Sequence, residues 1–336
     1  MLKVKHIVVV ILLSLSGINA QDVHFSQFDH HHQSVNPALS GYFDGDHRLT
    51  MNYRNQWLSV PVPYMTVGLY FDSRLTLKGR PGRIGWGIGM DYDQVGDSHL
   101  SMAKLAGSIN YGHVFANKHM VSLGITPGVA QRRLNNSKLR WDEQWTGDRY
   151  DPSLSSKENY DATGKFFLDL GAGLSYHFMQ TSRTYLTLGG SIFHLNKPDQ
   201  TFYGQGASAV ELPYRYVGQG TISIGMGDFM DLILLAQYQQ QLDYSESVGN
   251  ALLNFYLNRK PGSKLNMIAG FGVRLDDAMI PRLGFEWNNW MISGSYDLNT
   301  SSFKTATNKR GGPELALRYI YRSVKPIGIY KKCPIY

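Results

Sequence analysis

The stretch KFFLDLGAGLSYHF, residues 165–178, contains Ser175 and His177, two residue types that act together as nucleophile and base in hydrolases. In an extended chain, side chains two residues apart leave the same side about 7 Å from each other. That separation is too large for the histidine to take the proton of the serine. The motifs G-x-S-x-G, H-E-x-x-H and the P-loop do not occur in the chain. We therefore expect no enzymatic activity.

The remaining candidates for ligand chemistry are histidines and acids near the N-terminus. His24 and the run His30–His32 are possible metal ligands, but consecutive histidines point in different directions. Asp44 and Asp46 could contact calcium, but the spaced ligands and distal Glu of an EF-hand loop are missing, so a polar turn is expected. Cys333 is the single cysteine, which excludes an intrachain disulfide and a cysteine-based metal site. The sequence predicts no metal and no cofactor.

The elements that carry these residues have a period of two. In residues 165–178 bulky apolar side chains alternate with Asp169, glycines, Ser175 and His177. The same alternation recurs in RIGWGIGMDYD (83–93), MVSLGITPGVA (120–130), KLNMIAGFGVR (264–274) and ELALRYIYR (314–322). A period of two indicates strands with one apolar face and one mostly polar face.

Fourteen such segments are predicted, near residues 48–57, 64–73, 83–93, 98–115, 119–134, 163–179, 183–195, 212–225, 229–242, 244–258, 264–275, 278–287, 290–299 and 313–323. Many are about twice as long as the usual strand of a globular protein. A strand of about 12 residues spans roughly 40 Å, or roughly 30 Å when it is tilted in a barrel wall. That length matches the hydrocarbon core of a bilayer, which is about 30 Å thick.

The predicted fold is an all-β, antiparallel, up-and-down transmembrane barrel of about 14 strands, covering residues 48–323. Its apolar face meets lipid, its polar face lines the interior, and the sheet closes because lipid cannot satisfy a free strand edge. A large soluble β-sandwich or propeller is the alternative. The three longest connections, 135–162, 196–211 and 300–312, all follow odd-numbered strands and so fall on one side, as outer-membrane barrels require.

The N-terminus indicates export. Lys3 and Lys5 precede the apolar run IVVVILLSL and the small residues before Gln21, which predicts a signal peptide over residues 1–20, cleaved after Ala20. A membrane anchor is the alternative. The net charge of +7 is dispersed along the chain, so contact with outer-membrane lipid is expected and nucleic acid is not.

The barrel is flanked by two segments without alternation. Residues 21–47 precede the first strand and residues 324–336 follow the last. With an even number of strands, both termini are expected at the periplasmic mouth or partly in the lumen.

Charged residues of the predicted strands fall on the polar parity. They form a selectivity surface or bridge one another inside the lumen, and lumen bridging is the simpler interpretation because charge is tolerated there and is costly on the lipid side. These residues are Asp72, Asp91, Asp93, Asp169, Arg54, Arg274, Arg282 and Arg318.

Short motifs at the two ends of the mature chain resemble the PorP/SprF family of outer-membrane proteins from the type IX secretion and gliding machinery. In order they are QDVHFSQF (21–28), VNPALSG (35–41), YRNQW (53–57), RGGPELALRY (310–319) and CPIY (333–336). The segment with HHHQS, the Pro313 after Gly-Gly and the terminal Ile-Tyr depart from the family pattern.

The resemblance implies a non-enzymatic barrel that assists secretion, surface attachment or motility. Its implied partners are secreted proteins with a C-terminal sorting domain, such as adhesins, and periplasmic secretion or motility components. The matched positions are candidates for a structural or partner interface on the periplasmic side: Phe25, Gln27, Asn36, Pro37, Arg54, Asn55, Trp57, Glu314 and Cys333. Because closure makes the first and last strands neighbours, Arg54 and Glu314 are predicted to pair.

Other functions remain open. A channel for a small or hydrophobic solute, plugged by residues 21–47, is the first rival, and an outer-membrane hydrolase is the second. Trp141 and Trp145, in the long loop LRWDEQWTGDRYDP, are either a partner surface or interfacial anchors.

Overall fold

Alternating sequence produces alternating exposure in a closed barrel. The computed structural model describes residues 22–56, 64–77, 79, 81–96, 99–116, 118–135, 139–157, 163–202, 209–260, 262–301 and 307–323. The strands are β1 (His47–Gln56), β2 (Tyr64–Thr76), β3 (Gly82–Val95), β4 (Leu100–Phe115), β5 (His119–Arg133), β6 (Gly164–Met179), β7 (Tyr185–Phe193), β8 (Arg215–Met226), β9 (Met230–Gln241), β10 (Tyr244–Asn258), β11 (Leu265–Arg274), β12 (Ala278–Trp287), β13 (Trp290–Asn299) and β14 (Arg310–Tyr321). All fourteen predicted strands are confirmed, with ends within three residues of the prediction.

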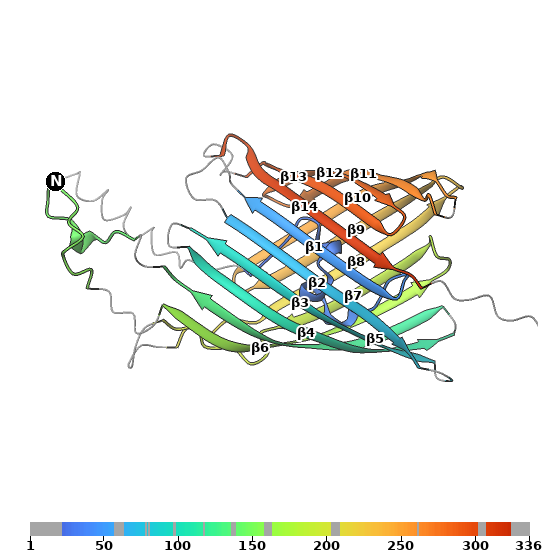
Figure 1. Ribbon diagram of the computed structural model, residues 1–336, viewed down its shortest axis with the longest axis horizontal. Coiled ribbons are helices and arrows are strands. Elements are labelled where there is room, and N and C mark those ends of the chain that lie inside the picture. The colour runs from blue at the N-terminus through green and yellow to red at the C-terminus, as the bar shows by residue number, and fades with distance from the viewer. Residues whose placement is uncertain are drawn as a thin grey trace, which may run out of the picture.

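Each strand pairs antiparallel with its neighbours in sequence, and β1 pairs with β14 to close the ring (Figure 1). The closing register runs from His47 opposite Tyr321 to Arg54 opposite Glu314. The long connections after β5, β7 and β13 lie at the mouth where odd-numbered strands end, as predicted. This mouth is called the loop mouth below, and the mouth where β1 begins is called the turn mouth.

The outward face is apolar and the inward face is polar. On β6, Leu168 is 66% exposed, whereas the neighbouring Asp169 is 2% exposed. Exposed large apolar residues occur on all fourteen strands or their ends, and buried charged and amide residues fill the inward positions. The alternative of a soluble sandwich is wrong, because the apolar faces are not packed against a second sheet. Among the described residues, no helix has the length and apolarity needed to cross a membrane.

Residues 22–46, called the plug, lie inside the barrel (Figure 1). The plug consists of single turns, η1 (Phe28–His30), α2 (His32–Val35) and η2 (Pro37–Leu39), joined by extended chain. Phe28 and Val35 pack into an apolar cluster with inward residues of β7–β12. The segment has no hydrophobic period because the wall surrounds it on every side.

The plug runs through the lumen from one mouth to the other. Asp22 reaches Arg215 at the start of β8, at the loop mouth, with 3.1 Å between carboxylate and guanidinium. At the other end, the backbone N–H of Asp46 donates to Tyr321 at the turn mouth, with 2.9 Å between nitrogen and oxygen. Residues 22–46 therefore lie along the lumen, and the periplasmic location expected for the two ends of the mature chain stays a prediction. The even strand number fixes where β1 begins, but the segment before it is long enough to thread the lumen.

Candidate functional site

The contact between plug and wall is the candidate site, and its densest part is a charged cluster near the loop mouth. Glu314 of β14 accepts hydrogen bonds from the plug backbone N–H groups of Ser26 and Gln27, at 2.7 and 2.8 Å. Arg54 of β1 donates to the carbonyl of His24 at 2.8 Å and pairs with Asp297 of β13 at 2.8 Å. The first, last and penultimate strands therefore hold one stretch of the plug.

Two arginines and three carboxylates make up this cluster. The predicted pair of Arg54 and Glu314 is confirmed, with 3.8 Å between Nε and Oε2. Arg274 of β11 contacts Asp297 at 2.9 Å and Glu246 of β10 at 3.2 Å. Arg274 also donates to the Ser26 hydroxyl at 2.7 Å. Such buried charges are tolerable only because each has an opposite charge or polar partner.

Asp29 and the histidines of the plug bind separate parts of the wall. Arg282 of β12 forms a two-pronged pair with Asp29, at 2.7 and 2.8 Å, and also donates to His30 at 2.6 Å. Although burial alone would raise it, the Arg282 guanidinium holds the pKa of the Asp29 carboxyl well below its usual range. Burial lowers the pKa of His30 to about 3, so its ring is neutral and accepts from Arg282. His31 contacts Asp91 of β3 at 2.9 Å.

The four histidines of the plug bind four different parts of the wall. His24, His30, His31 and His32 contact different wall residues, respectively Glu246, Arg282, Asp91 and Arg48. Burial lowers the pKa of His24 to about 4, opposed in part by Glu246, so the ring is neutral near pH 7. Among the described residues, no group of three or more histidine, aspartate, glutamate or cysteine side chains converges as metal ligands would.

Asn36 and Pro37 of the motif VNPALSG sit in the middle of the lumen. The Asn36 amide donates to the carbonyls of Leu174 and Gly190, at 2.9 and 3.3 Å, and its oxygen accepts from the Ala38 N–H at 2.9 Å. The wall facing this turn is made of glycines. A Cβ added to Gly124 would lie 2.7 Å from the Ala38 nitrogen, so these glycines are required for close approach.

The turn-mouth half of the plug is held by Asp72 of β2. This carboxylate accepts from the Gly41 N–H at 2.7 Å and pairs with Arg48 of β1 at 2.9 and 2.7 Å. Gly41 has φ +72°, a conformation that favours glycine. The Tyr42 ring stacks on His177 of β6, with 3.5 Å between ring centres.

Ser175 and His177 are closer than the strand spacing predicts. The serine hydroxyl lies 2.9 Å from His177 Nε2, because the longer histidine side chain leans along the strand. The prediction that they are too far apart to interact is wrong. His177 Nδ1 faces the Thr187 hydroxyl at 3.1 Å and not a carboxylate. Both residues are buried beneath the plug, at 1% and 2% exposure, so a substrate does not reach them in this conformation.

At the loop mouth, the start of the plug is bound through His194, the residue after β7. His194 contacts Asp22 of the plug at 3.0 Å and Asp169 of β6 at 2.8 Å. Lys104 of β4 pairs with Asp169 at 2.5 Å, and Arg215 of β8 pairs with Asp22. Although burial would lower it, Asp22 and Asp169 raise the pKa of His194 above its usual value.

The candidates from the matched motifs are mostly inside the barrel. Phe25, Gln27, Asn36, Pro37, Arg54 and Glu314 are buried, and Asn55 is half-buried, donating to the Tyr53 hydroxyl at 3.2 Å. Trp57 and Cys333 lie outside the described residues. Arg54, Asn55 and Glu314 lie toward the loop mouth, at the end of β1 and the start of β14. The periplasmic location predicted for the whole set stays a prediction.

The predicted lumen charges are buried or half-buried, and all except Asp93, which accepts from the Thr66 hydroxyl at 2.7 Å, contact an ionisable side chain of the wall or the plug, which favours bridging over a selectivity surface. Sequence reasoning missed Asp22, Ser26, Asp29, His194, Glu246 and Asp297. Glu246 and Asp297 were detectable, because they stand on the polar parity of strands. The plug residues gave a weaker signal, an unusually polar segment before β1.

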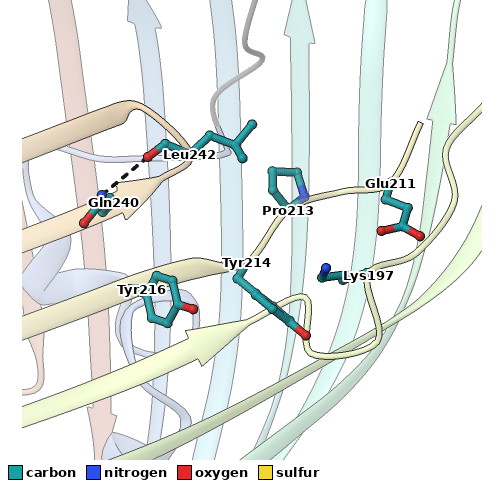
Figure 2. Close-up of a pocket in the computed structure, with 7 residues that line it drawn as sticks. All are labelled: Lys197, Glu211, Pro213, Tyr214, Tyr216, Gln240 and Leu242. Carbon is teal, nitrogen blue, oxygen red and sulfur yellow. Dashed lines mark hydrogen bonds between the residues drawn. The ribbon is translucent and has the colours of Figure 1, made fainter. Parts of the chain in front are cut away.

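A second feature is a pocket of about 450 Å³ on the outer side of the loop mouth (Figure 2). Its lining comes from the β7–β8 connection, the start of β8, and the end of β9 with the residue that follows it: Lys197, Glu211, Pro213, Tyr214, Tyr216, Gln240 and Leu242. Tyr216 and Leu242 are 48% and 55% exposed. Lys197 Nζ lies 5.0 Å from the centre of the Tyr214 ring.

The loop Trp141 and Trp145 flank η4 (Asp142–Gln144). Trp145 is 56% exposed, whereas Trp141 is half-buried. The prediction of a partner surface or of interfacial anchors stays a prediction.

Comparison with known families assigns the chain. The family described as "Type IX secretion system membrane protein PorP/SprF" matches residues 18–319, nearly the whole chain. The protein belongs to the PorP/SprF family. In the described residues, QDVHFSQF and VNPALSG lie in the plug, YRNQW lies at the end of β1 and RGGPELALRY lies in β14, whereas CPIY falls outside them. No curated protein sequence matches the chain.

Solved structures share the architecture at low identity. The toluene transporter TbuX of Ralstonia pickettii is 12% identical, with a TM-score of 0.51, over 86% of this chain and 93% of that one. The toluene transporter TodX of Pseudomonas putida is 10% identical, with a TM-score of 0.49, over 90% and 94%. The β domain of the Bordetella autotransporter BrkA is 9% identical, with a TM-score of 0.43, over 84% and 100%. TbuX supports an outer-membrane barrel fold and nothing finer.

Proposed function

We propose that this PorP/SprF member is a non-enzymatic outer-membrane barrel that assists the secretion or surface attachment of partner proteins by the type IX machinery. The partners are secreted proteins with a C-terminal sorting domain, such as adhesins, together with periplasmic secretion or motility components. The first 20 residues direct export and are removed after Ala20. The single observation that carries the proposal is the plug, read together with the family assignment.

The plug favours a binding role over free diffusion. Charged pairs and backbone hydrogen bonds fasten it at the loop mouth, at mid-lumen and at the turn mouth. A pore that conducts solutes needs a continuous wet path, and a segment bound along the lumen obstructs one. Ser175 and His177 are covered by the same segment, which is why we propose no hydrolase activity.

The experiment is deletion of the gene in the native bacterium, followed by measurement of cell-surface sorting-domain proteins and of small-solute uptake. We expect loss of surface display of at least one such protein while uptake is unchanged. Loss of solute uptake with normal display would instead establish the rival channel. Complementation with the wild-type chain is the control.

The rival, a plugged channel for a small or hydrophobic solute, has one specific observation in its favour. Phe28 and Val35 of the plug form an apolar cluster with the inward residues Phe193, Val217, Leu235, Val248, Leu252 and Ile280. This apolar strip lines one side of the lumen. Uptake of toluene by intact cells should fall after gene deletion only if the channel proposal is correct.

A further inference from the structure

The barrel wall has a step beside β7. β7 has 9 residues, whereas its neighbour β6 has 16. Their pairing ends where Gly171 stands opposite Phe193, so residues 164–170 of β6 extend beyond β7 toward the loop mouth. On its other side this part of β6 is fully paired with β5, from Arg133 opposite Gly164 onward. Residues 164–170 are called the β6 edge below.

The part of the β6 edge nearest to β7 binds the chain that follows β7. The Leu170 carbonyl accepts from the Leu195 N–H at 2.9 Å. The Asn196 side chain then takes the place of a peptide group, accepting from the Leu170 N–H at 3.1 Å and donating to the Leu168 carbonyl at 2.7 Å. The edge therefore already binds an amide in the manner of a strand.

Beyond Asn196 the edge has no partner strand among the described residues. In an antiparallel strand the N–H and C=O of one residue point to the same side. The backbone N–H and C=O groups of Leu168 and Leu170 point to the β7 side. Those of Phe166, two residues before Leu168, therefore point to the same side. Neither the Leu168 N–H nor the N–H and C=O of Phe166 has a hydrogen bond to a described residue.

Phe166 and Leu168 also present large apolar side chains outward, next to the unpaired backbone groups. Phe166 and Leu168 are 68% and 66% exposed, the highest values for large apolar side chains in the described part of the chain. Leu123, equally outward but on a strand paired on both sides, is 64% exposed, and Leu174, lower on β6 beside β7, is 53% exposed. Apolar surface beside unpaired backbone groups is costly in lipid, because lipid provides no hydrogen bonds.

We infer that the β6 edge is the docking site for an extended segment of a partner polypeptide, which adds a strand to the barrel wall at the loop mouth. Backbone hydrogen bonds to Phe166 and Leu168 supply the attachment, and alternate apolar side chains of the segment cover the same two residues. The inference rests on the proposed function and specifies how a partner attaches.

In its described residues, the β7–β8 connection does not pair with the backbone of Phe166 or Leu168. It folds into its own hairpin, in which Asp199 stands opposite Glu211, and its Leu212 packs against Phe167 on the inner side. Lys165 pairs with Asp199 at 3.0 Å, which fixes the hairpin near the edge without pairing its backbone to Phe166. A strand entering the step would lie between β6 and this hairpin.

The first test measures amide hydrogen exchange on the purified barrel in detergent. The Phe166 and Leu168 amides should exchange at least about 100-fold faster than that of Phe167, which faces β5. Protection of all three amides in the isolated chain would mean that the protein covers its own edge, and would overturn the inference.

The second test places a photoreactive diazirine side chain at position 166, 168 or 123 in cells. We expect the 166 and 168 probes to label one partner segment at sites two residues apart, and the 123 probe to label lipid. Leu168→Pro removes an N–H that is not used by β5, so the barrel should fold while partner labelling falls at least tenfold; Phe166→Pro is the second variant. Equal labelling after these substitutions, or labelling of lipid alone at 166, would overturn the inference.

These outcomes are separable from the proposed function. If gene deletion abolishes surface display but Leu168→Pro, folded in the outer membrane, displays normally, the secretion role stands and the β6 edge is not its docking site. If deletion has no effect on display, the proposed function itself fails.

Discussion

Removal of Glu314 should release the loop-mouth half of the plug without opening the barrel. In Glu314→Ala, the backbone N–H groups of Ser26 and Gln27 lose their acceptor in a site where Glu314 and both plug residues are 0% exposed. An unsatisfied buried group costs about 1–3 kcal/mol, which gives about 2–6 kcal/mol for two. Because water can enter the space left by the side chain, we expect about 2–4 kcal/mol, or about 30- to 700-fold in the docking equilibrium.

The assay is hydrogen exchange of the backbone amides of residues 22–30 in the detergent-folded barrel. Their exchange should accelerate by the factor given above, while the amides of β1 and β14 keep their protection because their backbone ladder is unchanged. Heat-modifiable migration on a gel confirms that the barrel is folded.

Glu286→Ala is the matched control. Glu286 is also an inward glutamate on a strand, but it pairs with Lys264 and Arg318 of the wall, at 3.2 and 3.7 Å, and not with the plug. Equal acceleration in both variants, or none in Glu314→Ala, would refute the claim that the carboxylate of Glu314 fastens the plug.

Three further outcomes follow from the same contacts. Burial lowers the pKa of His24 to about 4 and of His30 to about 3, so below pH 6.5 a released plug binds protons that the docked plug does not. Docking is therefore strongest above pH 6.5 and weakens as the pH falls toward 4, by up to about tenfold per pH unit for each histidine. The mobility of a spin label on the plug measures this change. Gly124→Ala should displace η2 and cost about 1–3 kcal/mol in thermal unfolding, whereas Gly107→Ala, with no atom nearer than 3.9 Å to its new Cβ, should not. Leu123→Lys should destabilise folding into bilayers by about 2–4 kcal/mol, measured by denaturant titration.

The barrel could be predicted because a lipid-facing strand requires a regular pattern of apolar residues in the sequence. Each strand must present apolar side chains to hydrocarbon at every second residue, and that requirement holds for β12 and β13 as strictly as for β6. The pairing of Arg54 with Glu314 followed from closure alone, since only the first and last strands have free edges in a linear meander. The strand register where β1 pairs with β14 then set the distance between the two side chains.

The plug could not be predicted in detail because its surroundings are not periodic. Its residues contact eight or more strands through side chains of differing length. Neighbouring positions such as Asp29, His30 and His31 therefore have different surroundings and different partners. The predicted separation of Ser175 and His177 was wrong for a related reason. Strand geometry fixes the spacing of Cβ atoms, but the tilt of a buried histidine is set by Tyr42 and Thr187, which are distant in sequence.

The motifs at the two ends of the chain form a single contact at the seam of the barrel. Ser26 and Gln27 of the first motif bind Glu314 of RGGPELALRY, and Arg54 of YRNQW binds the carbonyl of His24. Arg54 and Glu314 stand opposite each other only after β1 has paired with β14. The plug therefore gains its binding site at the loop mouth when the barrel closes and not before. Since the wall strands on both sides of the seam hold the same stretch of plug, docking in turn stabilises closure, so the fold couples an obstructed lumen to a completed wall.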